Sequence, residues 1–276
     1  MRNPFQTHAK RYPKARIAQA VIDQSLLAFL VGLVAVSLPV IMIVAYLLPF
    51  QTCFRDTLSH FYYAPFMGSF FVGMLIFVGA YLIVYVGEDA NGDEKTLSTL
   101  AGVFAIGVAV FPTSGSGCDA ATFAARAFGT FDANGNGAVG AYGYFQMFAV
   151  PIGPFEVTTA YLHYGFALAL FFILGWFAFF VFTAVDQPQC KADGSLTDVK
   201  KLRNAIYRTS GWIIFLCIGL IVAEAIYTAL TGKRFGGWVE LNLTFWLEAV
   251  ALWAFGATWL VKSRFHGRFL VDTPPD

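Results

Sequence analysis

Three ionisable side chains stand inside apolar stretches of this chain, at His163, Glu224 and Glu248. Imidazole and carboxylate groups carry protons and bind metal ions in many enzymes. Each residue lies about six or seven residues from the end of its stretch that we expect to face outward, which is roughly 10 Å along a helix. Since a charge at membrane depth costs at least about 2.5 kcal/mol, such residues usually face a partner or a cavity. The spacing therefore predicts one polar layer shared by three helices.

A second polar cluster, RDTLSHFYYAPF at 55–66, comes just before an apolar stretch. Asp56, Ser59 and His60 would stand above the layer and line the entrance of a shared, outward-facing pocket. Two structural interpretations compete with this pocket. Asp56 and Ser59 could cap the next helix, with Pro65 at an early helical position, and the deeper imidazole and carboxylates could be hydrogen-bonding groups inside a bundle.

Three chemistries fit such a pocket, and they leave both cofactor and catalysis open. His60, His163, Glu224 and Glu248 are candidate zinc ligands, which would indicate a metal-dependent membrane hydrolase acting on a lipid ester or amide, with Ser59 stabilising charge. His60 and His163 could instead bind one haem, although a shared haem needs both rings at equal depth and His60 is the shallower. The third chemistry is non-catalytic binding of a lipid headgroup or amphiphile, in which the carboxylates recognise a cation or donate protons.

Six apolar stretches must position these residues. Hydrophobic residues make up 58% of the chain and charged residues 13%, which is typical of an integral membrane protein. A helix of about 20 residues crosses a bilayer. We expect transmembrane helices at 26–48, 64–86, 97–113, 157–185, 210–231 and 241–262. The predicted fold is all-α, a six-transmembrane-helix bundle at 26–262 that forms the single domain of residues 1–276.

Basic residues predict the orientation of the bundle. With the N-terminus inside, fourteen of the eighteen lysines and arginines fall on the cytoplasmic side. Residues 1–25 are then a cytoplasmic segment in which an interfacial helix can form, and 263–276 are a cytoplasmic tail. We expect both termini to be cytoplasmic and the protein to lie in a bacterial inner membrane. The run KKLRNAIYR at 200–208 predicts a helix facing anionic lipid headgroups, and the net charge of +1 offers no field for nucleic acid.

Cysteine positions agree with this orientation. Cys53 and Cys118 fall on the predicted outer side, Cys190 falls in a cytoplasmic loop and Cys217 lies within a helix. Because disulfides persist on the oxidising side, the sequence predicts a bridge between Cys53 and Cys118. The alternative is that both thiols stay unpaired.

The outer loop at 114–156 is the largest segment outside the predicted helices. Its eight phenylalanines and tyrosines are too many for a freely solvated linker, so we expect the loop to cap the outer face. Within it, FDANGNGAVG at 131–140 starts like a calcium-binding loop. Gly143 occupies the position where the bidentate glutamate belongs, which favours a turn.

The chain resembles bacterial six-helix membrane proteins of a domain-of-unknown-function family, over about 55–262 without the aromatic loop. The resemblance is carried by SHFYYAPFMGSFFVGMLIFVGAYLIVYVG, LAGVFAIGVAVFPT, FFILGWFAFFVFT, KKLRNAIYRTSG and FWLEAVALWAFGATWLVK. A serine, a proline and a Phe-rich span are more distantly similar to the GPI-lipid-remodelling and autophagy-modulator family. That similarity implies a lipid-handling role, with Ser59 and Pro65 as pattern positions. The ceramidase and progestin-receptor superfamily would require HxxxH in the last helix, and FWLEAVALW lacks it.

We therefore expect an integral membrane protein with an outward-facing polar pocket that handles a lipid or small amphiphile. The alternative from another class is a non-catalytic accessory or structural subunit of a larger membrane protein complex. In that case the partners include other membrane subunits as well as membrane lipids, because Phe-rich helix faces pack equally well against lipid and protein.

Overall fold

The computed structural model describes residues 24–47, 54–64, 66–85, 93–111, 113, 130–131, 137–138, 150–152, 155–157, 159–184 and 195–264. Its α-helices are α2 (Gln24–Leu47), α3 (Met67–Val84), α4 (Asp93–Val110), α6 (Thr159–Trp176), α7 (Asp198–Thr231) and α8 (Leu243–Lys262). A 3-10 helix, η2 (Ser59–Tyr63), precedes α3, and a π-helical turn, η4 (Phe177–Val181), continues α6. Two short antiparallel pairs join β1 (Thr130–Phe131) to β2 (Gly137–Ala138) and β3 (Val150–Ile152) to β4 (Phe155–Val157).

Five of these helices are long and apolar enough to cross a membrane, namely α2, α3, α6 with η4, α7 and α8. The prediction of a helical membrane protein is thereby confirmed. The remaining helix, α4, corresponds to the predicted span at 97–113 and has 18 residues. It begins with Asp93, Glu94 and Lys95, and these three charges keep it out of the group of five.

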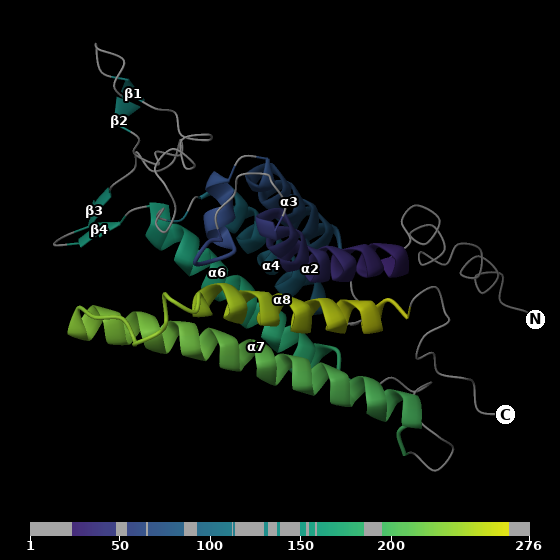
Figure 1. The fold of residues 1–276 in the computed structure, drawn as a ribbon. Helices are drawn as coiled ribbons and strands as arrows, with labels where there is room; N and C mark the ends of the chain where they lie inside the picture. Colours follow the sequence, from purple (N-terminus) through teal and green to yellow (C-terminus); the bar gives the residue numbers. More distant parts are fainter. Residues whose placement is uncertain are drawn as a thin grey trace, which may run out of the picture.

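The six helices pack in the order in which they occur in the chain, and the last returns to the first. Each of α2, α3, α4, α6, α7 and α8 contacts the next, and α8 also contacts α2. In Figure 1, α7 and α8 run side by side and α7 extends past α8. With 34 residues, α7 is about 51 Å long at 1.5 Å per residue. That length exceeds the roughly 30 Å hydrocarbon core of a bilayer.

Small residues bring two helix pairs into close contact. A Cβ atom added to Gly102 on α4 would lie 2.5 Å from the carbonyl oxygen of Gly79 on α3. A Cβ atom added to Gly256 on α8 would lie 2.9 Å from the carbonyl oxygen of Gly32 on α2. Because apolar side chains gain nothing by leaving lipid for another apolar surface, membrane helices rely on such close backbone packing.

Hydrogen bonds between helix ends show that α2 runs opposite to α8 and that α3 runs opposite to α4. The hydroxyl of Ser25, at the start of α2, donates to the carbonyl of Ser263, just after α8. The hydroxyl of Tyr85, after α3, donates to Glu94 at the start of α4 at 2.8 Å. The opposite end of the bundle holds η2. We call the end with η2 the Ser59 end, and the end where α7 begins the Lys200 end.

Trp259 of α8 is the centre of an aromatic cluster toward the Lys200 end. It is fully buried, and four rings surround it with centroids 5.2 to 5.9 Å away: Tyr81, Tyr85, Phe182 and Phe255. These pairs meet edge to face, the arrangement that the charge distribution of aromatic rings favours. The cluster therefore ties α3, α8 and the end of α6 into one core.

The start of α7 buries cationic and amide groups against the end of η4. Lys200 Nζ donates to the carbonyl of Phe182 at 3.3 Å and to that of Ala184. Asn204 Nδ2 donates to the carbonyl of Thr183 at 3.4 Å. Lys200, Arg203 and Asn204 are all buried. The prediction that this run faces lipid headgroups is wrong for Lys200 and Asn204, which donate to carbonyl groups that follow η4, and Arg203 is buried as well.

Candidate functional site

The polar cluster found in the sequence forms a segment that packs onto α8. We call residues 54–64 the docking segment. The ring of Phe54 lies 4.6 Å from that of Phe245, centroid to centroid, and the ring of Phe61 lies 6.2 Å from Phe245. Phe61 and Phe245 are fully buried. The N–H of Phe245 donates to the carbonyl of Asp56 at 2.9 Å, so side-chain packing and a backbone bond hold the segment at the start of α8.

Glu248 of α8 binds the docking segment through a backbone hydrogen bond. Its Oε2 accepts the backbone N–H of Leu58 at 2.7 Å. Leu58 directly precedes η2, where backbone N–H groups lack partners within the helix. The carboxyl oxygen of Glu248 supplies the acceptor that the helix itself does not give to this N–H group. Glu248, which was predicted to belong to a polar layer, thus bonds to the backbone N–H of Leu58.

His163 of α6 holds the next residue of the segment. Its Nε2 lies 2.9 Å from Ser59 Oγ, and its Nδ1 lies 2.7 Å from the carbonyl oxygen of Phe111, just after α4. A carbonyl only accepts hydrogen bonds, so Nδ1 carries the hydrogen. In the neutral ring Nε2 then accepts the hydroxyl hydrogen of Ser59. One imidazole therefore connects α4, α6 and the docking segment.

Glu224 is positioned differently, toward the far end of α7. It is buried, and its Oε1 accepts the hydroxyl of Thr228 at 2.9 Å. Arg234, which follows α7, places Nε 3.9 Å from the same oxygen. The Arg234 side chain is 51% exposed. An accessible cation thus lies beside a buried carboxylate.

Asp56 and Arg55 bring further charge to this end. Burial raises the pKa of Asp56 above its usual value, while the charges of Arg234 and Arg55 act in the opposite direction. Burial also lowers the pKa of Arg55 to about 10, against the influence of Asp56. The Arg55 guanidinium lies 6.0 Å from the ring centroid of Phe61, within cation–π range. The docking segment therefore carries a buried cation next to a half-buried carboxyl group.

The zinc and haem interpretations gain no support from the geometry. His60 is buried in η2, and its backbone N–H donates to Thr57 Oγ1 at 3.0 Å. In the part of the chain that the structure describes, no group of three or more His, Cys, Asp or Glu residues could hold a metal ion. The four candidate ligands His60, His163, Glu224 and Glu248 therefore do not assemble into a metal site. Both ring nitrogens of His163 are engaged, by Ser59 and Phe111, which leaves neither for haem iron.

The predicted polar layer is divided among separate partners. His163 and Glu224 are buried and Glu248 is half-buried. Among the described residues His163 bonds to Ser59 and Phe111, Glu224 to Thr228 and Glu248 to Leu58, rather than to one another. Because Leu58 and Ser59 are adjacent, the docking segment itself links Glu248 to His163. Sequence reasoning found these acids and bases but missed Leu58 and Phe111, whose contributions are backbone groups.

Some predictions lie outside the described residues. Cys53 and Cys118 are among them, so their bridge stays a prediction, and Cys217 is a buried free thiol. Most of the loop at 114–156 is likewise outside the described part, apart from its short strands.

No protein-family model, curated protein or solved structure matches this chain. The two resemblances drawn from its motifs therefore stay expectations.

Proposed function

We propose that this integral membrane protein binds a lipid headgroup or a small amphiphile at the Ser59 end. The observation that carries the proposal is that charges of both signs meet there. Arg234 lies 3.9 Å from Glu224 and its charge also acts on Asp56. A zwitterionic headgroup presents a phosphate and an amine, which complement the guanidinium and the two carboxylates. In this role the carboxylates recognise a cation.

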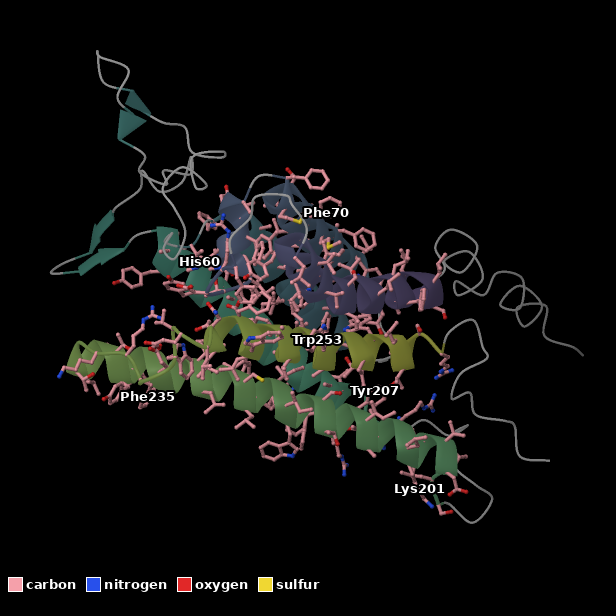
Figure 2. All side chains as sticks on the ribbon, viewed as in Figure 1. His60, Phe70, Lys201, Tyr207, Phe235 and Trp253 are labelled. Atoms are coloured by element: carbon pink, nitrogen blue, oxygen red, sulfur yellow. The ribbon has the colours of Figure 1, made fainter. Side chains whose placement is uncertain are left out.

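Exposed aromatic and aliphatic groups flank these charges, as an amphiphile requires. The rings of Tyr227 and Phe235 stack with centroids 4.1 Å apart, and the side chains are 36% and 42% exposed. Leu230, on the last turn of α7, is 81% exposed. Figure 2 shows Phe235 beside the end of α7 that lies opposite Lys201. Apolar surface next to paired charges favours a ligand with a polar head and a hydrocarbon tail.

Retention of lipid by the purified protein tests the proposal. The chain is solubilised gently and its bound lipids are identified by native mass spectrometry. We expect a zwitterionic lipid on the unchanged chain, and loss of that lipid in Arg234→Gln and in Asp56→Asn. Lys233→Gln is the matched control, because Lys233 is an exposed cation next to Arg234 in the chain. Equal retention in all three variants, or no retained lipid, would refute the proposal.

The proposal includes six membrane crossings with α4 as the third, and an outward Ser59 end. Both termini are then cytoplasmic, in a bacterial inner membrane. The asymmetry of basic residues supports this orientation. The test is labelling of cysteines introduced at Ser195 and Gly236, both exposed, with an impermeant reagent on intact cells. Gly236→Cys should be labelled and Ser195→Cys should not; labelling at Ser195 in intact cells would reverse the orientation.

An aromatic cap tied down by a disulfide also belongs to the proposal. The loop at 114–156 would cover the Ser59 end, with Cys53 bonded to Cys118. Closing a loop of about 65 residues contributes roughly 4 kcal/mol in the chain-entropy model. Mass measurement of alkylated protein before and after reduction decides the point, since an unchanged number of free thiols would exclude the bridge.

One observation favours a second candidate function, that of an accessory subunit. The window of α7 that could cross the membrane has the smallest buried share of the five, 17%. Its exposed face includes Trp212 and Leu216, at 65% and 63%, beside a shallow hollow. Lipid tails can cover this face as well as a protein can. Gentle solubilisation separates the two roles, because an accessory subunit stays with a larger assembly and a lipid-binding protein migrates as a small species.

A further inference from the structure

The hydrogen bonds of His163 have the pattern of an activated nucleophile. A base and a hydroxyl within hydrogen-bond reach, with the base oriented by a third group, are the components of nucleophilic catalysis. Here Ser59 Oγ is the hydroxyl, 2.9 Å from Nε2, and the carbonyl of Phe111 fixes the ring through Nδ1 at 2.7 Å. The tautomer that this carbonyl selects leaves the lone pair of Nε2 directed at the hydroxyl.

We propose that Ser59 and His163 are the nucleophile and general base of an acyl transfer from a lipid carboxylic ester. The inference deepens the proposed function, because it rests on a lipid binding at the Ser59 end. The structure places the two residues suitably for these roles. Ser59 is partly exposed, whereas His163 is 2% exposed and screened from water.

The step needs no co-reactant beyond an acceptor hydroxyl, which in the simplest case is water. Ser59 Oγ bonds to the ester carbonyl carbon while its proton moves to His163 Nε2, and the carbonyl π electrons become an oxyanion. When the oxyanion collapses, the bond to the alcohol oxygen breaks and the alcohol leaves with the proton from Nε2. The acyl group on Ser59 is then transferred to the acceptor hydroxyl, whose proton returns Ser59 to its starting state.

The ends of two helices favour the charges that this step creates. The carbonyl bound to Nδ1 follows α4, and carbonyl groups at a helix C-terminus carry partial negative charge, which stabilises a nearby imidazolium. The N–H of Ser59 itself begins η2 and has no acceptor among the described residues. Backbone N–H groups in such positions stabilise an oxyanion. The neighbouring N–H groups are used otherwise, Leu58 bonding to Glu248 and His60 to Thr57.

Rigidity of the docking segment keeps the two groups together. Glu248 holds Leu58, the residue before the nucleophile, and the Phe245 N–H holds Asp56 three residues before it. Gly68 fixes the other side, because a Cβ atom there would lie 2.2 Å from the carbonyl oxygen of Tyr62. Nucleophile and base thus come from separate elements whose positions are set by independent contacts.

A lipophilic fluorophosphonate, which reacts with activated serine hydroxyls, is the first probe. The purified full chain is treated with it and the adduct is located by peptide mass mapping. We expect one adduct, at Ser59, which disappears in Ser59→Ala. His163→Asn should slow labelling about 100-fold, because the asparagine amide can still donate to Phe111 but cannot reach Ser59 as a base. Ser69→Ala, which removes an exposed hydroxyl at the start of α3, should label at the unchanged rate.

A second measurement keeps the proposal testable if these variants fold poorly. Ser59→Cys puts a thiol at the position of the hydroxyl, and its alkylation rate is followed against pH. A thiol whose proton passes to His163 should react at pH values below the usual thiol pKa of about 8 to 9. Adding His163→Asn should shift the dependence of the alkylation rate back to higher pH. Identical profiles with and without His163, or no adduct at Ser59 on the unchanged chain, would refute the pair. If lipid is retained but Ser59 stays unlabelled, the binding function stands and this inference fails. Labelling at Ser59 without retained lipid would show an activated serine and would overturn the binding function.

Discussion

The two ends of the bundle bury polar groups in different ways. At the Lys200 end, the buried cation and amide belong to α7 and donate to carbonyl groups that follow η4, beside the aromatic cluster around Trp259. At the Ser59 end, the bonds come from a segment between helices that reaches α6 and α8 through a hydroxyl, an N–H and a carbonyl. At the first end, hydrogen bonds provide partners for polar groups that become buried on folding. At the second end, they orient a reactive hydroxyl. Burial alone therefore does not distinguish structure from function.

The largest effect should come from the aromatic cluster. Trp259→Ala removes a fully buried indole, and we expect a loss of about 3–5 kcal/mol in the free energy of unfolding. Thermal unfolding in detergent followed by circular dichroism measures it. Trp212→Ala is the control, because Trp212 is 65% exposed and should change stability by no more than about 0.5 kcal/mol. Equal losses in both variants would mean that the buried indole contributes no more to the free energy of unfolding than an exposed one.

Lys200 should contribute next. Lys200→Met keeps most of the side-chain volume but removes the donor to Phe182 and Ala184, and hydrogen bonds to charged groups contribute about 1.5–3 kcal/mol. Lys201→Met alters an exposed lysine that pairs with Asp198 at 3.2 Å, and we expect less than about 1 kcal/mol. The same unfolding measurement compares them. A larger loss in Lys201→Met would favour the headgroup interpretation of this run over the buried one.

At the Ser59 end the bonds should prove cooperative. His163→Ala and Glu248→Ala should each cost about 1–3 kcal/mol, because each leaves a group of the docking segment without its partner. Once one bond is lost the segment loosens, so the double variant should cost less than the sum. Pairing Glu248→Ala with Lys200→Met, at opposite ends, should be additive within about 0.5 kcal/mol. Additivity in both pairs would show that the docking segment does not couple α6 to α8.

The smallest effect concerns pH. Because burial raises the pKa of Asp56, its folded form holds the proton to higher pH than the unfolded chain. The resulting stability is complete below the unfolded pKa, about 3.9, and is lost as pH rises through the folded pKa. Asp56→Asn should therefore flatten the melting temperature measured from pH 3.5 upward. Glu240→Gln, an exposed carboxyl at the same end, should leave the slope in place. A steeper slope in Asp56→Asn would reverse the sign of this contribution.

How much the sequence could predict depended on what each group bonds to. His163, Glu224 and Glu248 were detectable because ionisable residues rarely occur at membrane depth. Ser59 was predicted to line the entrance of a pocket, stabilise charge or cap a helix, and its pairing with His163 was not predicted. Its bond to His163 depends on how α6 is rotated, which composition does not reveal.

Backbone partners left no trace in the sequence. Any residue at position 111 has a carbonyl and almost any residue at position 58 has an N–H, so neither stands out. The burial of Lys200 was missed for a related reason. The apolar stretch begins near 210, but α7 begins at Asp198, and Lys200 and Asn204 in its first turns donate to carbonyl groups that follow η4. Hydropathy locates the membrane, and it cannot distinguish a polar turn in water from one bonded to protein.

The contact between the first and last helices has a consequence for synthesis. The Ser25 hydroxyl bonds to a carbonyl 238 residues later in the chain, and Gly32 packs against Gly256. At about 5–20 residues per second, α2 leaves the ribosome roughly 10–50 s before α8. During that interval the face of α2 that carries Gly32 contacts lipid instead of α8. In ribosome-bound chains that end before α8, this face of α2 should therefore be uncovered, and an added α8 peptide should bind to it.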